Sequence, residues 1–381
     1  MERYLFLLGR TPDLSVRELI CCGFTAGTQL NSTLFEVSAE DEGAVIAKFN
    51  QLGGSTKLVR IVGEFGELNT EQLTEYVTAY FAQFERPTFA LGEINRDSLQ
   101  RINVGSIKQG LKERNISSRF IEGNREGLSA AVLSHKHVEE LLVIRISDEK
   151  IIFGKTLAVQ DIDEWTHRDR EKPYADRKKG MLPPKVGRMM VNIGIGEAQK
   201  ISQTAPRIYD PFCGTGTILM EAMEMGYEVI GSDVDMKAVA GASANLTWFA
   251  EEDELTAEFA VFQSDATRVT LDQLEEPVEL LVTEPFLGKQ TPNATLLPNI
   301  FRGMEKLYLG AFRQWRHILT ENAVVVIIFP VAQAGKIRFS LESIIDKLAT
   351  LGYTSTSDPS LYARPQAAIQ RQIWTFQFKR Q

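Results

Sequence analysis

One segment of the chain combines two closely spaced glycines with a carboxylate. It reads Asp210-Pro211-Phe212-Cys213-Gly214-Thr215-Gly216-Thr217 and lies between a predicted strand at 207–209 and a predicted helix at 217–225. Glycine has no side chain, so the backbone of such a turn can approach a bound ligand closely. Asp210 ends the strand, where its carboxylate can face a positively charged amino group. The segment therefore predicts a ligand site at the carboxyl end of a strand.

A second carboxylate follows at a spacing typical of nucleoside sites. Asp233 lies 19 residues after Gly214 and directly follows the next predicted strand, 227–232. A carboxylate there can accept hydrogen bonds from both hydroxyls of a ribose. Phosphate-binding motifs are disfavoured, because no lysine follows Gly216 and Leu219 stands where a dinucleotide motif has its third glycine. The arrangement favours an adenosine-type ligand without a pyrophosphate.

Asp265 has two interpretations. It follows the third predicted strand, 260–263, so its carboxylate could accept a hydrogen bond from the amino group of an adenine. It could equally cap the following segment by accepting a backbone N–H, which is a common role of Asp before a helix. The sequence leaves both roles open.

The elements around these residues indicate two regions of different architecture. Up to residue 159, predicted strands at 3–9, 30–38, 57–65, 88–94, 118–122, 141–147 and 151–159 alternate with helices at 14–24, 42–52, 70–84, 104–114 and 129–138. This alternation predicts a layered sheet with helices on one face. From residue 207, almost continuously apolar strands at 278–282 and 324–329 alternate with helices, which is typical of a parallel sheet covered on both faces. A last strand at 373–378 either joins this order or runs antiparallel to it.

A polar segment separates the two regions. Residues 160–180 are charged and weakly periodic, and Pro183 and Pro184 then open a helix. The net charge of the chain is −8, yet residues 168–188 contain eight basic and three acidic residues. Phosphate contacts need clustered Lys and Arg. The stretch is therefore either an RNA-contacting surface or a solvated linker.

The composition argues against several other classes of protein. No apolar run approaches the ~20 residues that cross a bilayer, and the first residues lack the features of a signal peptide. We expect a cytoplasmic protein without a membrane partner. Cys21, Cys22 and Cys213 form neither a disulfide framework nor a metal-ligand pattern, so no metal is expected.

Several segments resemble THUMP-domain tRNA guanine-N2-methyltransferases, and together they span nearly the whole chain. Residues 210–222 resemble the first motif of that family, and 181–192 resemble the helix that precedes it. Residues 154–161 are similar to the end of the THUMP domain, 168–173 to the following linker, and 3–19 to the ferredoxin-like N-terminal piece.

The resemblance implies an α/β fold with a definite plan. A Rossmann-like class I methyltransferase domain would be preceded by an α+β ferredoxin-like plus THUMP RNA-binding region. The expected boundaries are 1–66 for the ferredoxin-like domain, 67–160 for the THUMP-like domain, 161–182 for the linker and 183–381 for the methyltransferase domain.

The resemblance also implies the chemistry. The cofactor would be S-adenosyl-L-methionine, the substrate and partner a tRNA, and the product N2-methylguanosine. Some relatives require a small activating subunit, and the resemblance leaves the oligomeric state open. The residues expected to bind the cofactor are Leu182, Pro183, Asp210, Phe212, Cys213, Gly214, Gly216, Thr217, Asp233, Val234, Asp265 and Ala266.

The expected catalytic loop departs from the family pattern. Amino-methyltransferases carry Asp/Asn-Pro-Pro-Tyr/Phe after the fourth strand, where this chain has Thr283-Glu284-Pro285-Phe286. We expect these four residues to present the base, with Phe286 stacked on it. Three explanations of the departure stay open: Glu284 supplies the lost acceptor and acts as a base, the target is another atom or base, or the loop is inactive and the protein only binds tRNA. Lys289, Gln290 and Asn293 follow and could touch RNA or be solvated.

Overall fold

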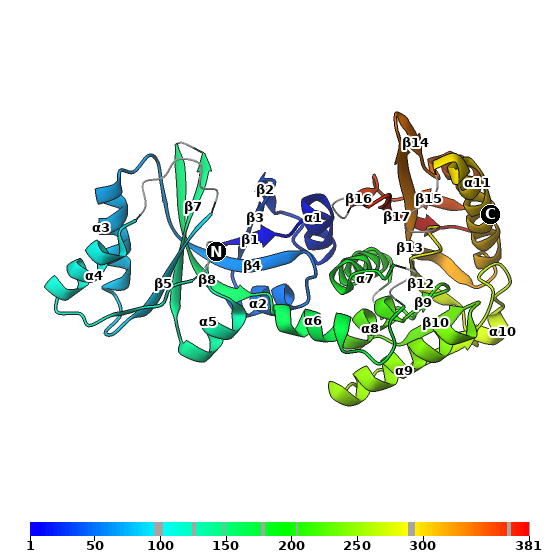
Figure 1. Ribbon diagram of the computed structural model, residues 1–381, viewed down its shortest axis with the longest axis horizontal. Helices are drawn as coiled ribbons and strands as arrows, with labels where there is room; N and C mark the ends of the chain where they lie inside the picture. The colour runs from blue at the N-terminus through cyan, green and yellow to red at the C-terminus, as the bar shows by residue number, and fades with distance from the viewer. Residues whose placement is uncertain are drawn as a thin grey trace. The chain divides into compact units, whose positions relative to one another are not determined.

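The computed structural model describes residues 1–94, 102–123, 127–147, 149–176, 180–202, 205–288, 294–363 and 367–380. The chain divides into two compact units, whose elements are labelled in Figure 1. The first unit contains residues 1–12, 26–51 and 55–163, and the second contains 13–25, 52–54 and 164–381. In the described ranges, no helix is both long and apolar enough to span a membrane.

The first unit is built on one eight-stranded sheet with the order β2-β3-β1-β4-β8-β7-β5-β6. Strand β5 runs parallel to β7 and β6, and the other neighbours are antiparallel. Helices α3 and α4 bury apolar side chains against β5, β7 and β8. The bounds are β1 (Glu2–Leu8), β2 (Thr28–Asn31), β3 (Leu34–Ala39), β4 (Ser55–Phe65), β5 (Thr88–Ile94), β6 (Arg119–Phe120), β7 (Glu139–Ser147), β8 (Lys150–Val159), α2 (Glu42–Asn50), α3 (Thr70–Phe81), α4 (Val104–Glu113) and α5 (Ala130–Lys136).

The elements of this unit follow the predicted order with one correction. The strand expected at 30–38 is a hairpin, because the side chain of Asn31 accepts hydrogen bonds from the backbone N–H (2.8 Å) and the hydroxyl (3.0 Å) of Thr33. This turn reverses the chain between β2 and β3. Strands from 1–66 and from 67–160 share the sheet through the pairing of β4 with β8. The division into a ferredoxin-like and a THUMP-like domain stays a prediction.

The second unit contains a nine-stranded sheet in which β11-β10-β9-β12-β13 are parallel. Strand β17 is antiparallel to β13, and β15 and β16 are antiparallel to β17. The expected strands are thus present, and the last one takes the antiparallel alternative. The bounds are β9 (Ile208–Asp210), β10 (Val229–Asp233), β11 (Phe259–Gln263), β12 (Val278–Thr283), β13 (Leu319–Ala334), β14 (Ile337–Phe339), β15 (Tyr353–Ser355), β16 (Ser360–Tyr362), β17 (Ile369–Phe378), α1 (Pro12–Cys21), α6 (Ile162–Arg170), α7 (Pro184–Gln199), α8 (Thr217–Glu224), α9 (Met236–Glu252), α10 (Leu271–Leu274), α11 (Leu297–Trp315) and α12 (Ile345–Ala349).

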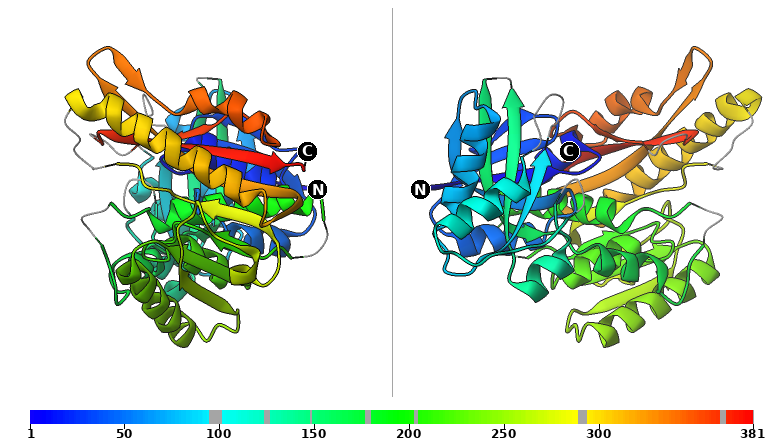
Figure 2. Two further views of the ribbon diagram at one scale, coloured as in Figure 1. Left: turned by 90° about the vertical axis from the view of Figure 1, so that its right-hand side faces the viewer. Right: turned by 60° about the vertical axis from the view of Figure 1, so that its left-hand side comes forward.

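Both faces of this sheet are buried, which explains its continuously apolar strands. Val324, Val326 and Ile328 of β13 point to a core shared with α7, α8 and α9. The alternate residues Val325 and Ile327 point to a second core under α11. Figure 2 shows α11 lying along this second face beside β17. Side chains alternate between the faces of a strand, so a strand covered twice needs apolar residues at every position.

A segment from the N-terminal region belongs to the second unit. Leu14 of α1 lies in the core beneath α7. The buried carboxylate of Glu18 accepts hydrogen bonds from the backbone N–H groups of Gly53 and Gly54, both at 2.8 Å, and from the side-chain amide of Asn192 at 2.6 Å. Residues 13–25 and 52–54 are therefore fixed to α7 by a buried carboxylate that has three donors.

Helix α6 lies within the range 161–182, where we expected a linker. Its inner face is charged, which hides the helical period from a hydrophobicity pattern. Buried Arg168 contacts Glu221 and Glu224 of α8, and buried Arg188 of α7 contacts the same two carboxylates. The guanidinium of Arg168 also lies 4.3 Å from the ring centre of Trp165. Opposite charges thus compensate one another where three helices meet.

These ion pairs correct the interpretation of residues 168–188. Arg168, Lys172 and Arg188 are buried, and the Lys172 ammonium lies 3.3 Å from the Thr217 hydroxyl. Three of the eight basic residues are therefore structural and offer no surface to RNA. Arg170 is exposed, whereas Arg177, Lys178 and Lys179 lie outside the described residues.

Candidate active site

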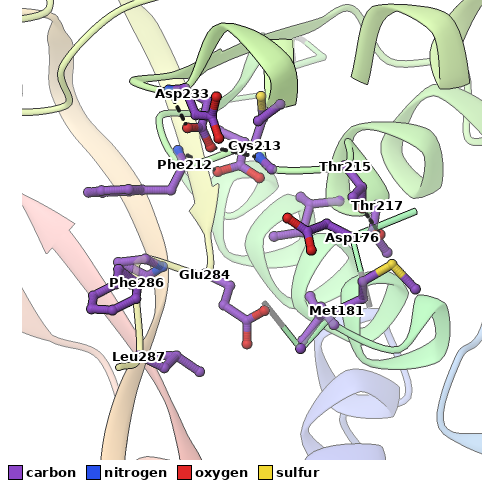
Figure 3. A pocket seen from close by; sticks show the side chains of 18 of the residues that line it. Asp176, Met181, Phe212, Cys213, Thr215, Thr217, Asp233, Glu284, Phe286 and Leu287 are labelled. Atoms are coloured by element: carbon purple, nitrogen blue, oxygen red, sulfur yellow. Dashed lines mark hydrogen bonds between the residues drawn. The ribbon is translucent and has the colours of Figure 1, made fainter. Parts of the chain in front are cut away.

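A cavity of about 900 Å³ lies at the carboxyl edge of the parallel sheet in the second unit. It is lined by the residues that follow β9, β10, β11 and β12, by residues 180–182 before α7, and by the start of β17. In Figure 3, Phe286 and Leu287 lie on one side, Asp176 and Thr217 lie on the other, and Glu284 lies between them. Parallel sheets bind their ligands at this edge, because the loops after the strands converge there.

The glycine turn has the backbone that its sequence predicts. Gly214 (φ +54°) and Gly216 (φ +79°) both adopt the left-handed conformation, which is strained for residues with a side chain. The Cys213 N–H donates to the Ser232 carbonyl at 2.9 Å, which joins the turn to β10. The turn thus brings main-chain atoms to the cavity wall directly before helix α8.

The side chain of Asn245 on α9 forms hydrogen bonds to this turn. Its buried amide nitrogen donates to the carbonyls of Thr215 (2.8 Å) and Tyr174 (2.9 Å), and its oxygen accepts from the Tyr174 N–H (2.8 Å). Thr215 and Tyr174 both line the cavity. One side chain therefore positions both the glycine turn and the segment that contains Tyr174.

Asp210 is buried at the floor of the cavity. Its Oδ1 accepts hydrogen bonds from the Thr283 hydroxyl at 2.6 Å and from the Phe212 N–H at 3.0 Å. The pKa of Asp210 is raised to about 7, mainly by burial and to a smaller extent by the nearby carboxylates of Asp233 and Glu284, while these two hydrogen bonds act in the opposite direction. A bound cation would remove much of this cost, so the carboxylate is suited to receive an ammonium group.

Asp233 ends β10 with both carboxylate oxygens oriented. Oδ2 accepts from the Gly214 N–H at 3.1 Å, and Oδ1 accepts from the Asp235 N–H at 2.9 Å. A carboxylate oxygen can accept more than one hydrogen bond. Asp233 is therefore held by the backbone with acceptor capacity left for two neighbouring hydroxyls.

Asp265 caps the turn that follows it, and its role toward an adenine stays a prediction. Its Oδ1 accepts from the Thr267 N–H and hydroxyl, both at 2.8 Å, so the carboxylate does cap the following turn. The residue also lines the cavity, together with Ala266. Capping and ligand contact are compatible here because they can use different oxygens.

The loop after β12 places its residues in different environments. Thr283 is 0% exposed and directs its hydroxyl to Asp210, so it reaches the site only through that carboxylate. Glu284 lines the cavity, and its Oε1 accepts a hydrogen bond from Arg371 Nε at 2.5 Å. Pro285 and Phe286 also line the cavity, and the Phe286 ring is 58% exposed.

The structure brings most of the expected site residues together. Those that line the cavity are Leu182, Asp210, Phe212, Cys213, Gly214, Thr217, Asp233, Val234, Asp265, Ala266, Glu284, Pro285 and Phe286. Three do not line it. Pro183 is the N-cap residue before α7, Gly216 is the N-cap residue before α8, and Thr283 lies behind Asp210. Lys289, Gln290 and Asn293, expected as possible RNA contacts, lie outside the described residues.

Sequence reasoning missed part of the cavity wall. Tyr174 and Asp176 come from the expected linker, and Leu307 comes from α11. Arg371 comes from β17, 87 residues after its partner Glu284. Linear spacing gives no signal for such a pair. Arg371 lies between Gln370 and Gln372, before the strand expected at 373–378, so the local sequence gives no indication either.

Comparison with known proteins finds a similarity within the second unit. Residues 176–329 match the sequence model of UPF0020, the RMKL-like methyltransferase domain. The matched range lies in the second unit, which thus includes a methyltransferase domain. The matched range begins with the cavity residue Asp176 and ends within β13.

The curated relatives have the activity in their names that the sequence resemblance predicts. The tRNA (guanine(10)-N2)-dimethyltransferase of Methanothermobacter thermautotrophicus is 32% identical over 201 residues, which is 52% of this chain and 52% of that protein. The enzyme of the same name from Pyrococcus abyssi is 30% identical over 42% of this chain and 46% of that protein. The chain thus matches about half the length of these relatives.

Solved structures support the fold of both units of the chain. TrmN from Thermus thermophilus has a TM-score of 0.55 at 13% identity and covers 99% of this chain and 100% of its own. SMU.472, crystallised in complex with SAH, has a TM-score of 0.52 at 12% identity and covers 100% of this chain and 98% of its own. At these identities the likeness extends to the fold alone. The class I methyltransferase fold expected from the sequence is confirmed.

Proposed function

We propose that this protein is an S-adenosylmethionine-dependent tRNA methyltransferase that modifies the exocyclic N2 of a guanosine. The observation that carries the proposal is one cavity that joins the glycine turn and Asp233 to the Glu284-Pro285-Phe286 loop. The first group suits a nucleoside cofactor and the second suits a planar base. The curated relatives support guanine N2 as the target.

The residues present are compatible with the cofactor. A cavity of about 900 Å³ lies within the range of small-molecule sites. Asp210 would receive the ammonium of the methionine part, Asp233 the ribose hydroxyls, and Asp265 the adenine amino group. When bound, S-adenosylmethionine supplies a methyl group on a positively charged sulfur. Gly214 lines the cavity and would leave room for the ligand where a side chain would intrude.

The chain's own groups would act mainly by orientation. The exposed Phe286 ring would stack on the extruded base and hold its plane against the cofactor. Held in this way, the lone pair of the guanine N2 would face the methyl group that bound S-adenosylmethionine would supply. One amino proton leaves the nitrogen. Glu284 is the acceptor in the cavity for that proton, since the Thr283 hydroxyl already donates to Asp210.

The first unit would bind the tRNA as a ferredoxin-like and THUMP-like region, so that duplex shape and phosphates guide the base into the cavity. The cytoplasmic location expected from the sequence belongs to the same proposal. A small activating subunit remains one possible requirement of the reaction and is tested by reconstitution.

The decisive experiment is transfer of a labelled methyl group to unmodified tRNA transcripts, followed by mass spectrometry of the nucleosides. Appearance of N2-methylguanosine or N2,N2-dimethylguanosine supports the proposal. Transfer to another nucleoside corrects the target while keeping the reaction. Cofactor and tRNA binding without transfer would favour a tRNA-binding protein with an inactive loop, and transfer only to DNA or protein would replace the substrate class.

A further inference from the structure

The loop after β12 needs an acceptor that its first residue cannot provide. Thr283 is fully buried and its hydroxyl donates to Asp210 at 2.6 Å. An amino group that loses a proton during methylation requires a hydrogen-bond acceptor beside it. Glu284 is the next residue, and its carboxylate lines the cavity. The side chain of Glu284 is longer than Asp or Asn at the usual position, so it needs to be held in place.

Arg371 of β17, two strands from β12 in the same sheet, contacts this carboxylate. Its Nε donates to Glu284 Oε1 at 2.5 Å, and the two side chains are only 10% and 15% exposed. Among the described residues that line the cavity, Arg371 is the one Lys or Arg, whereas Asp176, Asp210 and Asp233 add negative charge. Ion pairs with little solvent exposure are screened weakly, so this contact is stronger than a surface salt bridge.

The strand register explains why position 371 can reach the loop. Thr283 pairs with Ile327 of β13, and Arg371 pairs with Pro330, three residues further along the same strand. Two strand spacings of ~4.8 Å separate β12 from β17, a gap that a long arginine side chain can bridge at the sheet edge. On its other side, Arg371 pairs with Tyr362 of β16, whose ring centre lies 6.0 Å from the guanidinium.

We propose that Arg371 is a positioning residue that fixes the Glu284 carboxylate as the acceptor for the amino proton of the base. The inference rests on the proposed function. The guanidinium occupies one side of Oε1, and a carboxylate has about four acceptor sites, so the same group can also receive the amino hydrogen. The acceptor thus lies at Glu284, one residue after the position that carries it in other amino-methyltransferases. The positive charge of Arg371 on β17 balances the negative charge of this carboxylate.

The test measures tRNA methyl transfer and separates kcat from KM. Arg371→Met is expected to lower kcat about 10- to 100-fold, as loss of a group that orients a catalytic residue does. The KM for tRNA and the dissociation constant of S-adenosylhomocysteine should change less than about threefold, since binding uses other residues. Arg371→Lys should restore part of kcat. Arg338→Met is the control. Arg338 lies on β14 outside the cavity and pairs with Glu342 at 2.8 Å. Its replacement should leave kcat at the wild-type value.

The double variant decides between positioning and general stabilisation. Glu284→Gln alone should lower kcat about 10²- to 10⁴-fold. Adding Arg371→Met should lower kcat little further, because both changes remove the same positioned carboxylate. Independent losses that multiply, or an Arg371→Met variant with wild-type kcat, would overturn the inference. So would a loss confined to cofactor affinity or thermal stability. Wild-type protein without transfer to any tRNA overturns the proposed function, and the inference with it, whereas the other outcomes leave that function standing.

Discussion

At the scale of single residues, the site depends on how much solvent each polar group keeps. Asp210 and Asp233 end neighbouring parallel strands, yet only Asp210 is fully enclosed. Burial alone accounts for the largest part of its raised pKa. The same side chain is then protonated or ionised near neutral pH depending on what occupies the cavity.

We therefore expect the affinity for S-adenosylhomocysteine to fall as the pH drops below about 7. The ligand's ammonium needs the ionised form of Asp210, and the pKa of about 7 means that this form is lost progressively on acidification. The dissociation constant should rise up to about tenfold per pH unit between pH 6.5 and 5.5. Calorimetry in two buffers of different ionisation enthalpy should also detect proton release on binding near pH 7.

The Asp210→Asn variant supplies the control for this titration. It should bind the ligand weakly, with an affinity that hardly changes between pH 5.5 and 7.5. An affinity of the wild-type protein that is equal at pH 5.5 and 7.5 would show that Asp210 does not pair with the ammonium.

Phe286 gives a second prediction at this scale. The residue is 58% exposed and lines the cavity, so its ring is accessible to a base bound there. Base stacking on an aromatic ring contributes about 1–3 kcal/mol. Phe286→Ala should thus lower kcat/KM for tRNA by about tenfold to a hundredfold in a steady-state assay, while Phe286→Tyr keeps the ring and the activity. Equal loss in both variants would contradict stacking.

At the scale of elements, the strands and their helices follow from the sequence wherever apolar periodicity carries the information. The parallel strands are predicted by continuous apolar runs such as 324–329, and the glycine turn by residue type. Helix α6 is not predicted because Arg168 occupies its inner face. A hydrophobicity pattern does not reveal a buried charged residue. The role of Arg371 in the cavity is not predicted because its partner Glu284 lies 87 residues away. Only the strand register brings the two residues together.

The charged junction of α6, α7 and α8 yields a stability prediction. Arg188 is 3% exposed and pairs with Glu221, which is 1% exposed, at 2.8 Å. Removing one partner of a buried pair leaves an uncompensated charge, which costs about 3–5 kcal/mol. We expect Arg188→Met to lower the free energy of unfolding by about that amount in urea denaturation.

Exposed Arg170 on α6 is the matched control for this prediction. Arg170→Ala should change the free energy of unfolding by less than about 0.5 kcal/mol. If Arg188→Met instead weakened tRNA binding without affecting stability, the structural role of this cluster would be wrong.

At the scale of the whole molecule, the units are not consecutive pieces of the chain. Residues 13–25 and 52–54 pack with the methyltransferase domain, although the sequence resemblance assigns them to an N-terminal domain. Leu14 and Glu18 are buried there. The apolar face of α1 would look the same in the sequence whether it packed on the sheet of the first unit or on α7. The local sequence therefore could not predict that α1 belongs to the second unit.

A fragment of residues 183–381, the expected domain, should accordingly fold poorly. It lacks the apolar contact of Leu14 and the Glu18 carboxylate that accepts from Asn192. We expect a lower midpoint of thermal unfolding than in the full chain, together with binding of a hydrophobic dye. Cooperative unfolding of the fragment at the temperature of the intact methyltransferase domain would show that the segment is dispensable.

The Glu18–Asn192 contact also affects the order of events during translation. Its two residues are 174 positions apart. Ribosomes add roughly 5–20 residues per second, so helix α1 leaves the ribosome roughly ten seconds or more before α7 exists to cover it. During that interval the apolar face of α1 is a natural ligand for chaperones, and slow codons upstream of α7 would prolong its exposure.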